Sequence, residues 1–439
     1  MARKLFGTDG VRGVAGELVT AELALSLARS AARLSAAERP QVVILRDTRE
    51  SGDMLQAALA AGVSSAGGDA LLAGVLPTPA APLLLARYGF DLAVVVSASH
   101  NPYQDNGIKF FGADGYKLSD ETELAIEQQL ESAQTTPPSA IGRVRELRGA
   151  TEDYLRELHT RFGELDLSGL DVLLDCANGA TYRVAPEIFR RLGARVTALA
   201  DAPDGRNINA GCGSTHVHAL AEMVLRGGHA VGFAFDGDGD RVLAVDRAGT
   251  VVDGDELLAL AALHLRRRGR LSGDGVVVTV MTNYGFHRAM EQAGVAVATT
   301  NVGDRYVLEE LRQRGWTLGG EQSGHMIEMG FNRTGDGIAS ALLTLEALEG
   351  RDLSERGAMA KLPQRLVSVC VRDRDALEHA PAVAEGIRSA ADGLAGRGRV
   401  LVRSSGTEPL VRVMVEAPSE DEAQELCERL AALVQRELA

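Results

Sequence analysis

The sequence has few cysteines. Only four occur among its 439 residues, and they are widely scattered, at Cys176, Cys212, Cys370 and Cys427. No two have the spacing of metal-ligating cysteines, and the count is low for a disulfide framework. A disulfide scaffold and a cysteine metal site are therefore excluded, and we expect a reducing compartment.

Long apolar runs are missing as well. No uninterrupted apolar stretch approaches the roughly 20 residues that a membrane helix needs. The first residues, Met1 to Gly7, lack the apolar core of a signal peptide. We therefore expect a cytoplasmic protein with no membrane partner.

A surplus of basic residues is also absent. The chain has 46 Lys and Arg against 60 Asp and Glu, a formal net charge of −14. A non-specific nucleic-acid binder needs a net basic surface, so we expect no nucleic-acid partner. An anionic small molecule is not excluded, because local arginines decide whether such a ligand binds.

Prolines are scarce beside glycines, 13 against 49, which indicates many tight turns rather than disorder. Hydrophobic residues at 45% and charged residues at 24% are typical of a soluble globular enzyme. At roughly 100–200 residues per domain, the length of the chain predicts three or four domains.

The order of helix and strand patterns predicts an α/β fold with four domains. Three similar mixed α/β domains are followed by a smaller C-terminal α+β domain. Thr20 is the predicted N-cap of a helix that ends near Leu34. The polar stretch from Gln134 to Ser139 is a predicted linker. The predicted domains are residues 1–150, 151–253, 254–364 and 365–439.

One stretch, Val94 to Pro102, organises the rest of the chain. Its β-branched residues run into two serines, a histidine, an asparagine and a proline. This pattern predicts a buried strand that delivers the hydroxyls of Ser97 and Ser99 to its C-terminal end, where open α/β sheets bind ligands. From these residues alone, an ordinary serine-rich turn explains the pattern equally well.

A second loop alternates acids with glycines and contains Asp236, Asp238 and Asp240. Hard oxygen ligands at this density suit Mg²⁺ or Ca²⁺. An EF-hand is unlike this loop, since Arg241 and Arg247 stand where that motif needs Gly and Glu. Three neighbouring carboxylates repel one another without a cation. The loop therefore predicts a divalent metal site, with Mg²⁺ favoured.

A serine combined with a metal loop favours phosphoryl chemistry. The G-x-S-x-G elbow of serine hydrolases is absent, and His100 is adjacent to Ser99 in sequence, which rarely suits a triad. A phosphoserine, three aspartates and Mg²⁺ would total about −3, taking the phosphate near −2. Other loops must supply cations, and the candidates are Arg12, Lys109, Arg241, Arg403 and Arg412.

Two further loops carry weaker signals. Small hydroxyl residues and a glycine follow Arg403, as in loops that bind anions. Glu321, Ser323 and His325 form a polar loop suited to sugar hydroxyls. Taken singly, each of these two loops is also explained as a solvated turn. Arg12 and Lys109 are likewise explained, taken singly, as ordinary surface cations.

Taken together, the motifs resemble the α-D-phosphohexomutase superfamily and, within it, the phosphoglucosamine mutase family. The resemblance covers essentially the whole chain, and it implies that the four domains are arranged around a central cleft. Gln322 is the residue type that the glucosamine enzymes carry, whereas Ser404 departs from the expected Lys or Pro and removes a cation near the phosphate loop. The matching segments are residues 6–10, 97–102, 212–216, 236–241, 320–325 and 403–409.

The resemblance implies a role for each site residue. Ser99 would be the phosphoserine and would hold Mg²⁺ together with Asp236, Asp238 and Asp240. Besides Ser99, the implied catalytic residues are Arg12, Lys109 and His325. The implied substrate-binding residues are Arg241, Glu321, Ser323, His325, Arg403, Ser405, Gly406, Thr407 and Arg412.

The resemblance also implies an isomerase that interconverts glucosamine 6-phosphate and glucosamine 1-phosphate. One Mg²⁺ per chain and glucosamine 1,6-bisphosphate, as intermediate and activator, would take part. The product would feed amino-sugar nucleotide synthesis for cell-wall precursors, and a homodimer is compatible with the family. Three alternatives stay open: a mutase for glucose or mannose phosphates, a Mg²⁺-dependent phosphatase, and a non-catalytic sugar-phosphate binding protein.

Replacing Ser99 with Ala tests the assignment of the phosphoserine. The variant should lose turnover, because no other side chain of the loop would carry the phosphoryl group, while its circular dichroism spectrum stays that of the wild type. A coupled assay for glucosamine 1-phosphate measures the loss. Mutase activity near that of the wild type in Ser99→Ala would contradict the assignment.

Overall fold

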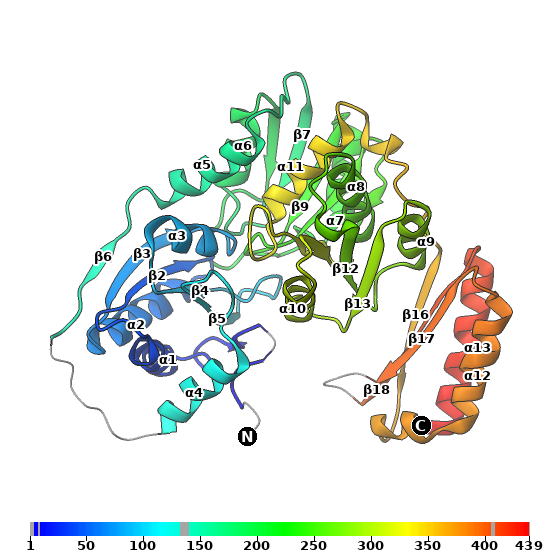
Figure 1. The fold of residues 1–439 in the computed structure, drawn as a ribbon, viewed down its shortest axis with the longest axis horizontal. Helices are drawn as coiled ribbons and strands as arrows, with labels where there is room; N and C mark the ends of the chain where they lie inside the picture. The colour runs from blue at the N-terminus through cyan, green and yellow to red at the C-terminus, as the bar shows by residue number, and fades with distance from the viewer. Residues whose placement is uncertain (1–3, 8, 132–139, 405–408, 439) are drawn as a thin grey trace. The chain divides into compact units, whose positions relative to one another are not determined.

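The computed structural model of the chain describes residues 4–7, 9–131, 140–404 and 409–438. The predicted linker at Gln134 to Ser139 lies outside the described residues. The chain divides into two compact units (Figure 1). The first unit comprises Met1–Val280 and Ala298–Arg356, and the second comprises Met281–Val297 and Gly357–Ala439.

The first sheet of the larger unit has six strands in the order β1-β5-β4-β2-β3-β6. Strand β2 pairs in parallel with β3 and β4, whereas β4 pairs antiparallel with β5. The predicted strand before Ser97 is confirmed as β4, and all five of its residues are buried. The strands are β1 (Val11–Val14), β2 (Gln41–Arg46), β3 (Asp69–Val75), β4 (Leu92–Val96), β5 (Asp105–Gly112) and β6 (Val144–Glu146).

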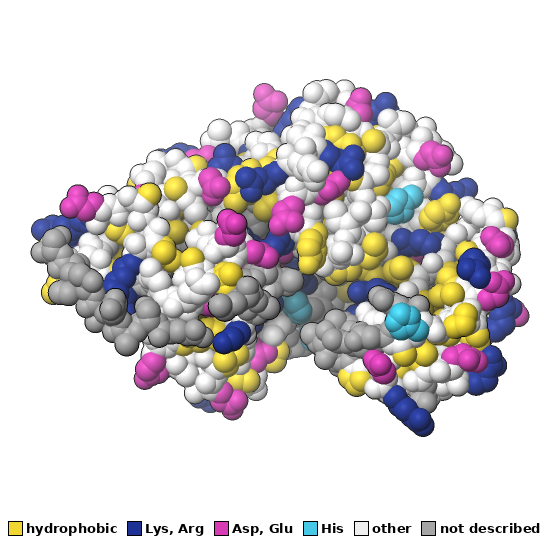
Figure 2. Space-filling model, turned by 60° about the horizontal axis from the view of Figure 1, so that its bottom comes forward, with side chains coloured by type: hydrophobic (Ala, Val, Ile, Leu, Met, Phe, Trp, Pro, Cys, Tyr) yellow, Lys and Arg dark blue, Asp and Glu magenta, His cyan; other side chains and the backbone are white. Residues whose placement is uncertain are grey.

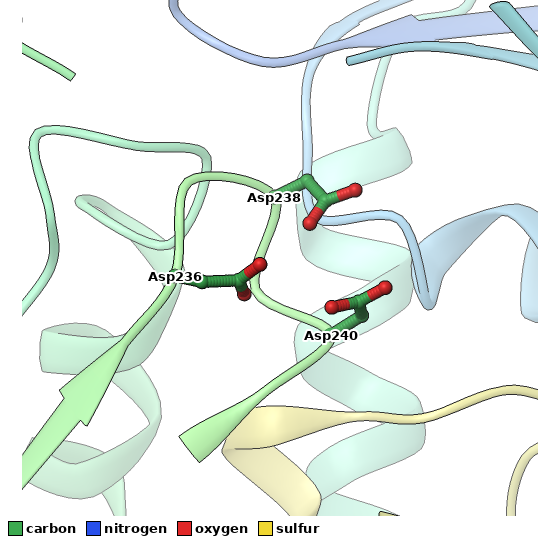
Figure 3. A group of neighbouring side chains, drawn as sticks. All are labelled: Asp236, Asp238 and Asp240. Atoms are coloured by element: carbon green, nitrogen blue, oxygen red, sulfur yellow. The ribbon is translucent and has the colours of Figure 1, made fainter. Parts of the chain in front are cut away.

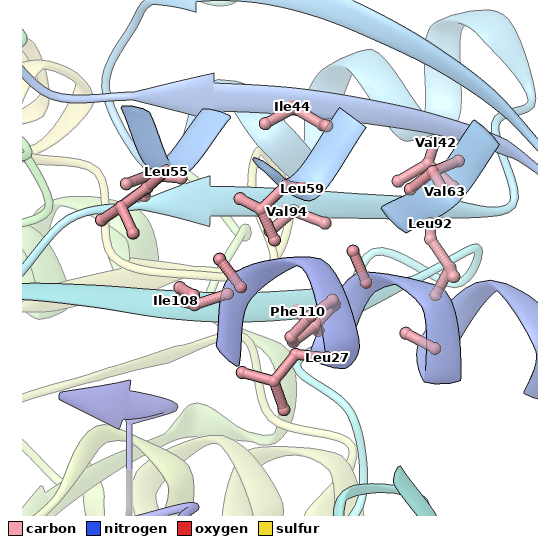
Figure 4. Packing of buried hydrophobic residues seen from close by; sticks show 14 of the residues in the cluster. Leu27, Val42, Ile44, Leu55, Leu59, Val63, Leu92, Val94, Ile108 and Phe110 are labelled. Carbon is pink, nitrogen blue, oxygen red and sulfur yellow. The ribbon is translucent and has the colours of Figure 1, made fainter. Parts of the chain in front are cut away.

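Helices cover this sheet, because alternate residues of the fully buried strand β4 point to opposite faces. The helices are α1 (Ala21–Leu34), α2 (Gly52–Ser65), α3 (Ala80–Tyr88) and α4 (Asp120–Glu131). The predicted cap of α1 is confirmed, since Thr20 Oγ1 accepts a hydrogen bond from the Leu23 amide at 3.2 Å. Leucines of α1 and α2 pack against Val94 and Phe110 of the central strands (Figure 4). This core holds the strand that leads to Ser99.

The second sheet has five strands in the order β11-β10-β9-β7-β8. Strand β9 is buried throughout and ends directly before Asp236. The strands are β7 (Asp171–Asp175), β8 (Arg195–Leu199), β9 (Val231–Phe235), β10 (Val242–Asp246) and β11 (Val251–Val252). The helices of this segment are α5 (Ala150–Phe162), α6 (Val184–Arg191) and α7 (Val217–Gly227).

The third sheet has four strands in the order β13-β12-β14-β15. The turn between β14 and β15 contains Glu321 and His325. The strands are β12 (Gly275–Thr279), β13 (Ala296–Thr300), β14 (Leu318–Gly320) and β15 (Met326–Glu328). The α-helices are α8 (Gly254–Arg267), α10 (Asp304–Arg314) and α11 (Gly337–Leu348), and two 3-10 turns span Ser272–Asp274 and Leu353–Glu355.

The second unit is built on an antiparallel sheet in the order β16-β18-β17. Valines of β18 pack with Leu394 and Leu430 of two helices in a separate core. The elements are α9 (Tyr284–Gln292), β16 (Gln364–Cys370), a 3-10 helix (Arg374–His379), α12 (Pro381–Leu394), β17 (Arg399–Ser404), β18 (Leu410–Glu416) and α13 (Glu420–Leu438). The predicted fold class, three mixed α/β domains followed by a smaller α+β domain, is thus confirmed.

The surface mixes charges of both signs. On the face drawn in Figure 2, Lys and Arg side chains are interspersed with Asp and Glu side chains. Among the residues that the structure describes, no helix is both long enough and apolar enough to cross a membrane.

Two glycines inside helices should respond in opposite ways to the same substitution. A Cβ on Gly62 of α2 would lie 2.2 Å from the carbonyl oxygen of Leu25 in α1, whereas a Cβ on Gly393 of α12 meets no atom within 4 Å. Gly62→Ala should cost about 1–3 kcal/mol through overpacking. Gly393→Ala should add up to about 1 kcal/mol of helix propensity. Thermal unfolding measures both changes, and shifts of equal sign would contradict the packing described for α1 and α2.

Candidate active site

Ser99 lies at the buried end of β4, with a side chain that points toward the second sheet. The residue is 1% exposed and has a left-handed backbone, with φ at 52°. Its Oγ donates a hydrogen bond to Asp236 Oδ2 at 2.5 Å. The exit of β4 and the acidic loop after β9 therefore meet, as their separate motifs predict.

The ring of His100 also reaches Ser99, with Nδ1 3.2 Å from Oγ. From the sequence, a histidine in this adjacent position is rarely suited to a hydrolase triad, and the properties of His100 agree with that expectation. Burial lowers the pKa of His100 to about 4, and the charges of Arg241 and Arg12 contribute to the same shift. Such a weak base is a poor proton acceptor at neutral pH, so the contact does not make Ser99 a hydrolase-type nucleophile.

The acidic loop gathers three carboxylates around one small space (Figure 3). Asp236, Asp238 and Asp240 are buried, and each places one oxygen within 4.8 Å of the others. Within the described parts of the chain, Oδ1 of Asp238 and Oδ1 of Asp240 have no hydrogen-bond partner. Buried carboxylate oxygens without partners are costly unless a cation meets them.

This arrangement suits a divalent cation. Burial raises the pKa of Asp236 well above its ordinary value, and the negative charges of Asp240 and Asp238 raise it further. A bound cation would remove that repulsion, and a cluster of hard oxygen donors is the ligand set that Mg²⁺ prefers. The three aspartates therefore fit a metal ion.

Lys109 supplies a buried cation beside the acidic loop. Its side chain is 1% exposed, and its Nζ lies 2.9 Å from Asp238 Oδ2 and 3.0 Å from Asp9 Oδ2. Burial lowers the pKa of Lys109, but attraction to Asp238 and Asp9 outweighs it and raises the pKa overall. Lys109 is therefore charged, and its interpretation as a surface lysine is wrong.

Arg12 belongs to a chain of ion pairs that continues from Lys109. Asp9 pairs with Arg12 and with Lys117, and Lys117 also pairs with Asp304. Burial raises the pKa of Asp9, but Lys109, Lys117 and Arg12 together lower it well below its ordinary value.

Sequence reasoning did not find Asp9, Lys117 and Asp304. Asp9 lies within the segment 6–10, which carries the family resemblance, so a signal for it was present. Lys117 and Asp304 stand in no motif, and they meet only because the segment after β5 and the start of α10 lie close together.

The loop after β14 brings His325 to the acidic cluster. A β-bridge joins His325 to Arg241, and His325 Nδ1 lies 3.6 Å from Asp240 Oδ2. The amide of Gly335 donates to Nε2 of His325 at 3.2 Å. Burial lowers the pKa of His325, but attraction to the carboxylates of Asp240 and Asp304 raises the pKa overall. The carboxylate and the amide thus orient the ring.

The side chains of Glu321 and Gln322 in this loop have hydrogen-bond partners outside the acidic cluster. Glu321 Oε1 accepts a hydrogen bond from the Gly303 amide at 3.1 Å. Gln322 Nε2 donates to Asp253 Oδ2 at 3.3 Å. Ser323 is exposed.

Arg403 and Arg412 lie in the second unit as directly opposed residues of β17 and β18. Opposed residues of antiparallel strands share a face of the sheet. Burial lowers the pKa of Arg403, and the charge of Arg412 lowers it further, as expected for a pair that an anion would relieve. The adjoining candidates Ser405, Gly406 and Thr407 lie outside the described residues.

Comparison with models of protein families shows to which family the chain belongs. Four models of the phosphoglucomutase/phosphomannomutase family match in order: alpha/beta/alpha domain I at residues 3–137, domain II at 152–249, domain III at 253–365 and the C-terminal domain at 366–433. The chain belongs to the α-D-phosphohexomutase superfamily. As a phosphohexomutase, it is an isomerase of the mutase type.

Named relatives of this phosphohexomutase are similar over nearly their whole length. The phosphoglucosamine mutase of Desulforudis audaxviator is 53% identical, covering 98% of this chain and 97% of the relative. The phosphoglucosamine mutase of Moorella thermoacetica is 52% identical, covering 96% and 97%.

Solved structures share the fold of this phosphohexomutase. A phosphoglucomutase/phosphomannomutase family protein from Burkholderia thailandensis has a TM-score of 0.83 at 24% identity, covering 99% of this chain and 98% of the other. A putative phosphomannomutase from Thermus thermophilus has a TM-score of 0.80 at 24% identity, covering 99% and 100%.

The charge of the acidic loop makes metal binding depend on pH. Because the pKa of Asp236 is raised, protons compete with the cation, so Mg²⁺ should bind more tightly as pH rises and should release protons on binding. Calorimetry in buffers of different ionisation enthalpy at pH 6 and pH 8 measures both effects. Asp236→Asn should weaken binding at least about tenfold, since losing even a residue that only supports a metal ligand typically costs about 10- to 100-fold in affinity.

The matched control for this measurement is Asp91→Asn, which removes a carboxylate outside the loop. It should bind Mg²⁺ as the wild type does. An affinity that is independent of pH, or that survives in Asp236→Asn, would show that the acidic loop is not the metal site.

Proposed function

We propose that this phosphohexomutase interconverts glucosamine 6-phosphate and glucosamine 1-phosphate. The observation that carries the proposal is the buried hydroxyl of Ser99 at 2.5 Å from Asp236, within a loop that fits a divalent cation. The choice of the amino sugar is supported by the relatives named phosphoglucosamine mutase and by Gln322.

Ser99, as a phosphoserine, would give its phosphoryl group to O1 of glucosamine 6-phosphate. The Oγ–P bond would break, a P–O1 bond would form, and the proton of the O1 hydroxyl would pass, by way of a proton acceptor in the site, to Ser99 Oγ. The resulting glucosamine 1,6-bisphosphate would turn around, its O6–P bond would break, a P–Oγ bond would form on Ser99, and the serine proton would pass to O6. Glucosamine 1-phosphate is left, the serine is phosphorylated again, and no net phosphate is consumed.

Asp236, Asp238, Asp240 and a phosphate oxygen on Ser99 would together hold one Mg²⁺. When bound, this ion offsets negative charge on the phosphoryl group in transfer. The chain's own part is to keep three carboxylates close together in a buried loop that water reaches poorly.

Three cations of the site, Lys109, Arg12 and Arg241, would balance the remaining negative charge. The raised pKa of Lys109 favours charge stabilisation over proton transfer for this residue. Arg12 and Arg241 are likewise suited to phosphate oxygens, since a guanidinium binds them in pairs. His325, oriented by Asp240, is the candidate for handling the proton of the sugar hydroxyl.

Substrate would be held by two sets of groups. Glu321 and Ser323 suit the hydroxyl and amino groups of the sugar, because a carboxylate and a hydroxyl both accept hydrogen bonds. The phosphate that is not reacting would be bound by Arg403, Ser405, Gly406, Thr407 and Arg412.

A comparison of substrates tests this proposal. The kcat/KM for glucosamine 6-phosphate should exceed that for glucose 6-phosphate at least about tenfold, as expected when one hydrogen-bonding group distinguishes two substrates. A coupled assay for each 1-phosphate gives both values. A preference for glucose would overturn the sugar specificity, and net release of inorganic phosphate in place of an isomer would show a phosphatase.

A further inference from the structure

Beneath the Ser99 loop lies a buried arginine that the mechanism does not use. Arg49 follows β2 and is 0% exposed. Its Nε donates to Asp47 Oδ2 at 2.8 Å, and its two terminal nitrogens donate to backbone oxygens of the loop. The four backbone acceptors are the carbonyl oxygens of Ser99, Asn101, Pro102 and Asp105.

Every N–H donor of the Arg49 guanidinium has an acceptor. A guanidinium has five N–H donors in a fixed plane, and Arg49 makes five hydrogen bonds, one from Nε and two from each terminal nitrogen. Its charge is balanced by Asp47, which is also 0% exposed. Buried ion pairs add little net stability, since desolvation offsets their attraction. Holding one loop conformation therefore explains this pair better than stability does.

Ser97 extends the network to the amide of Ser99. The hydroxyl of Ser97 donates to Asp47 Oδ2 at 2.6 Å and accepts from the Ser99 N–H at 2.9 Å. Ser97 therefore links the backbone of the proposed phosphoserine to the Arg49–Asp47 ion pair.

The second sheet's loops supply the rest of the support. Asn209 Nδ2 donates to the carbonyl oxygens of Ser99 and Asn101 at 2.9 and 3.0 Å. The backbone of Gly237 approaches so closely that a Cβ there would lie 2.5 Å from the Ser99 carbonyl oxygen. Both backbone polar groups of Ser99 are thus engaged, and its hydroxyl is left to face Asp236.

Ser99 needs such support. Its φ of 52° is in the left-handed region, which is strained for a residue with a Cβ. Strained backbone of this kind persists only where the surrounding structure over-determines it. The hydrogen bonds from Arg49, Ser97 and Asn209 provide that constraint.

We propose that Arg49, Ser97 and Asn209 are positioning residues that hold Ser99 in its left-handed conformation, so that Oγ keeps its aim at the acidic loop. The proposal rests on the proposed function, because aim matters only if Ser99 carries the phosphoryl group. Loss of aim lowers the rate of transfer, since a shift of about 1 Å can cost about 100-fold. It leaves substrate binding unchanged, because none of the three side chains is assigned to the sugar or its phosphate.

The variants Arg49→Lys, Ser97→Ala and Asn209→Ala test this role. Each should lower kcat about 10- to 100-fold with KM within about twofold of the wild-type value. The matched control is Arg161→Lys, which alters another little-exposed arginine, paired with Glu328 and Glu346, away from the Ser99 loop. It should keep its kcat at a comparable loss of thermal stability.

A second measurement does not depend on turnover. Hydrogen–deuterium exchange of the metal-free protein should be faster over residues 97–105 in the three variants than in the wild type, and unchanged there in Arg161→Lys. Should Arg49→Lys fail to fold, Ser97→Ala and Asn209→Ala decide the question.

The outcomes separate the two proposals. Wild-type kcat in both Ser97→Ala and Asn209→Ala, or unchanged exchange over residues 97–105, would overturn the positioning role. A wild-type protein without mutase activity would overturn the proposed function instead, and the exchange measurement would still show whether the three side chains hold the loop.

Discussion

Three buried carboxylates within 4.8 Å of one another are the constraint on which the larger unit depends. Asp236, Asp238 and Asp240 follow a fully buried strand, so water cannot screen their repulsion. Besides Arg241 of the loop itself, polar side chains approach the carboxylates from other parts of the fold. Lys109 comes from β5 of the first sheet, and His325 comes from the loop after β14 of the third. The acidic loop therefore lies where three sheets meet.

In the same arrangement the histidine that touches the Ser99 hydroxyl is not one of the groups that carry charge. Lys109 and Asp9 hold each other ionised, since each stabilises the charged form of its partner. His100, which touches the Ser99 hydroxyl, is kept neutral by burial and by nearby arginines. Fixed charges thus surround a hydroxyl that has no strong base beside it on its own loop. Such a site suits the transfer of a group that already carries charge, where stabilising negative charge matters more than activating the nucleophile.

Much of the support for Ser99 comes from side chains outside the charged cluster. The guanidinium of Arg49 donates hydrogen bonds to carbonyl oxygens of the Ser99 loop. Asn209, which lies between β8 and α7, donates further hydrogen bonds to the same loop. The residues proposed to orient Ser99 Oγ are therefore different from those that carry the charge of the site.

The sequence by itself determined the strands and the loops at their ends. The β-branched run before Ser97 and the alternation of Asp with Gly after residue 235 are local patterns, and local patterns predict local structure. The motifs also indicated the superfamily, because several of them occur together in one chain. Tertiary structure alone decided that Lys109 is buried, that Asp9, Lys117 and Asp304 form ion pairs, and that Arg49 holds the Ser99 loop. These partners stand about 50 to 190 positions apart, and only the packing of sheets and helices brings such distant side chains into contact.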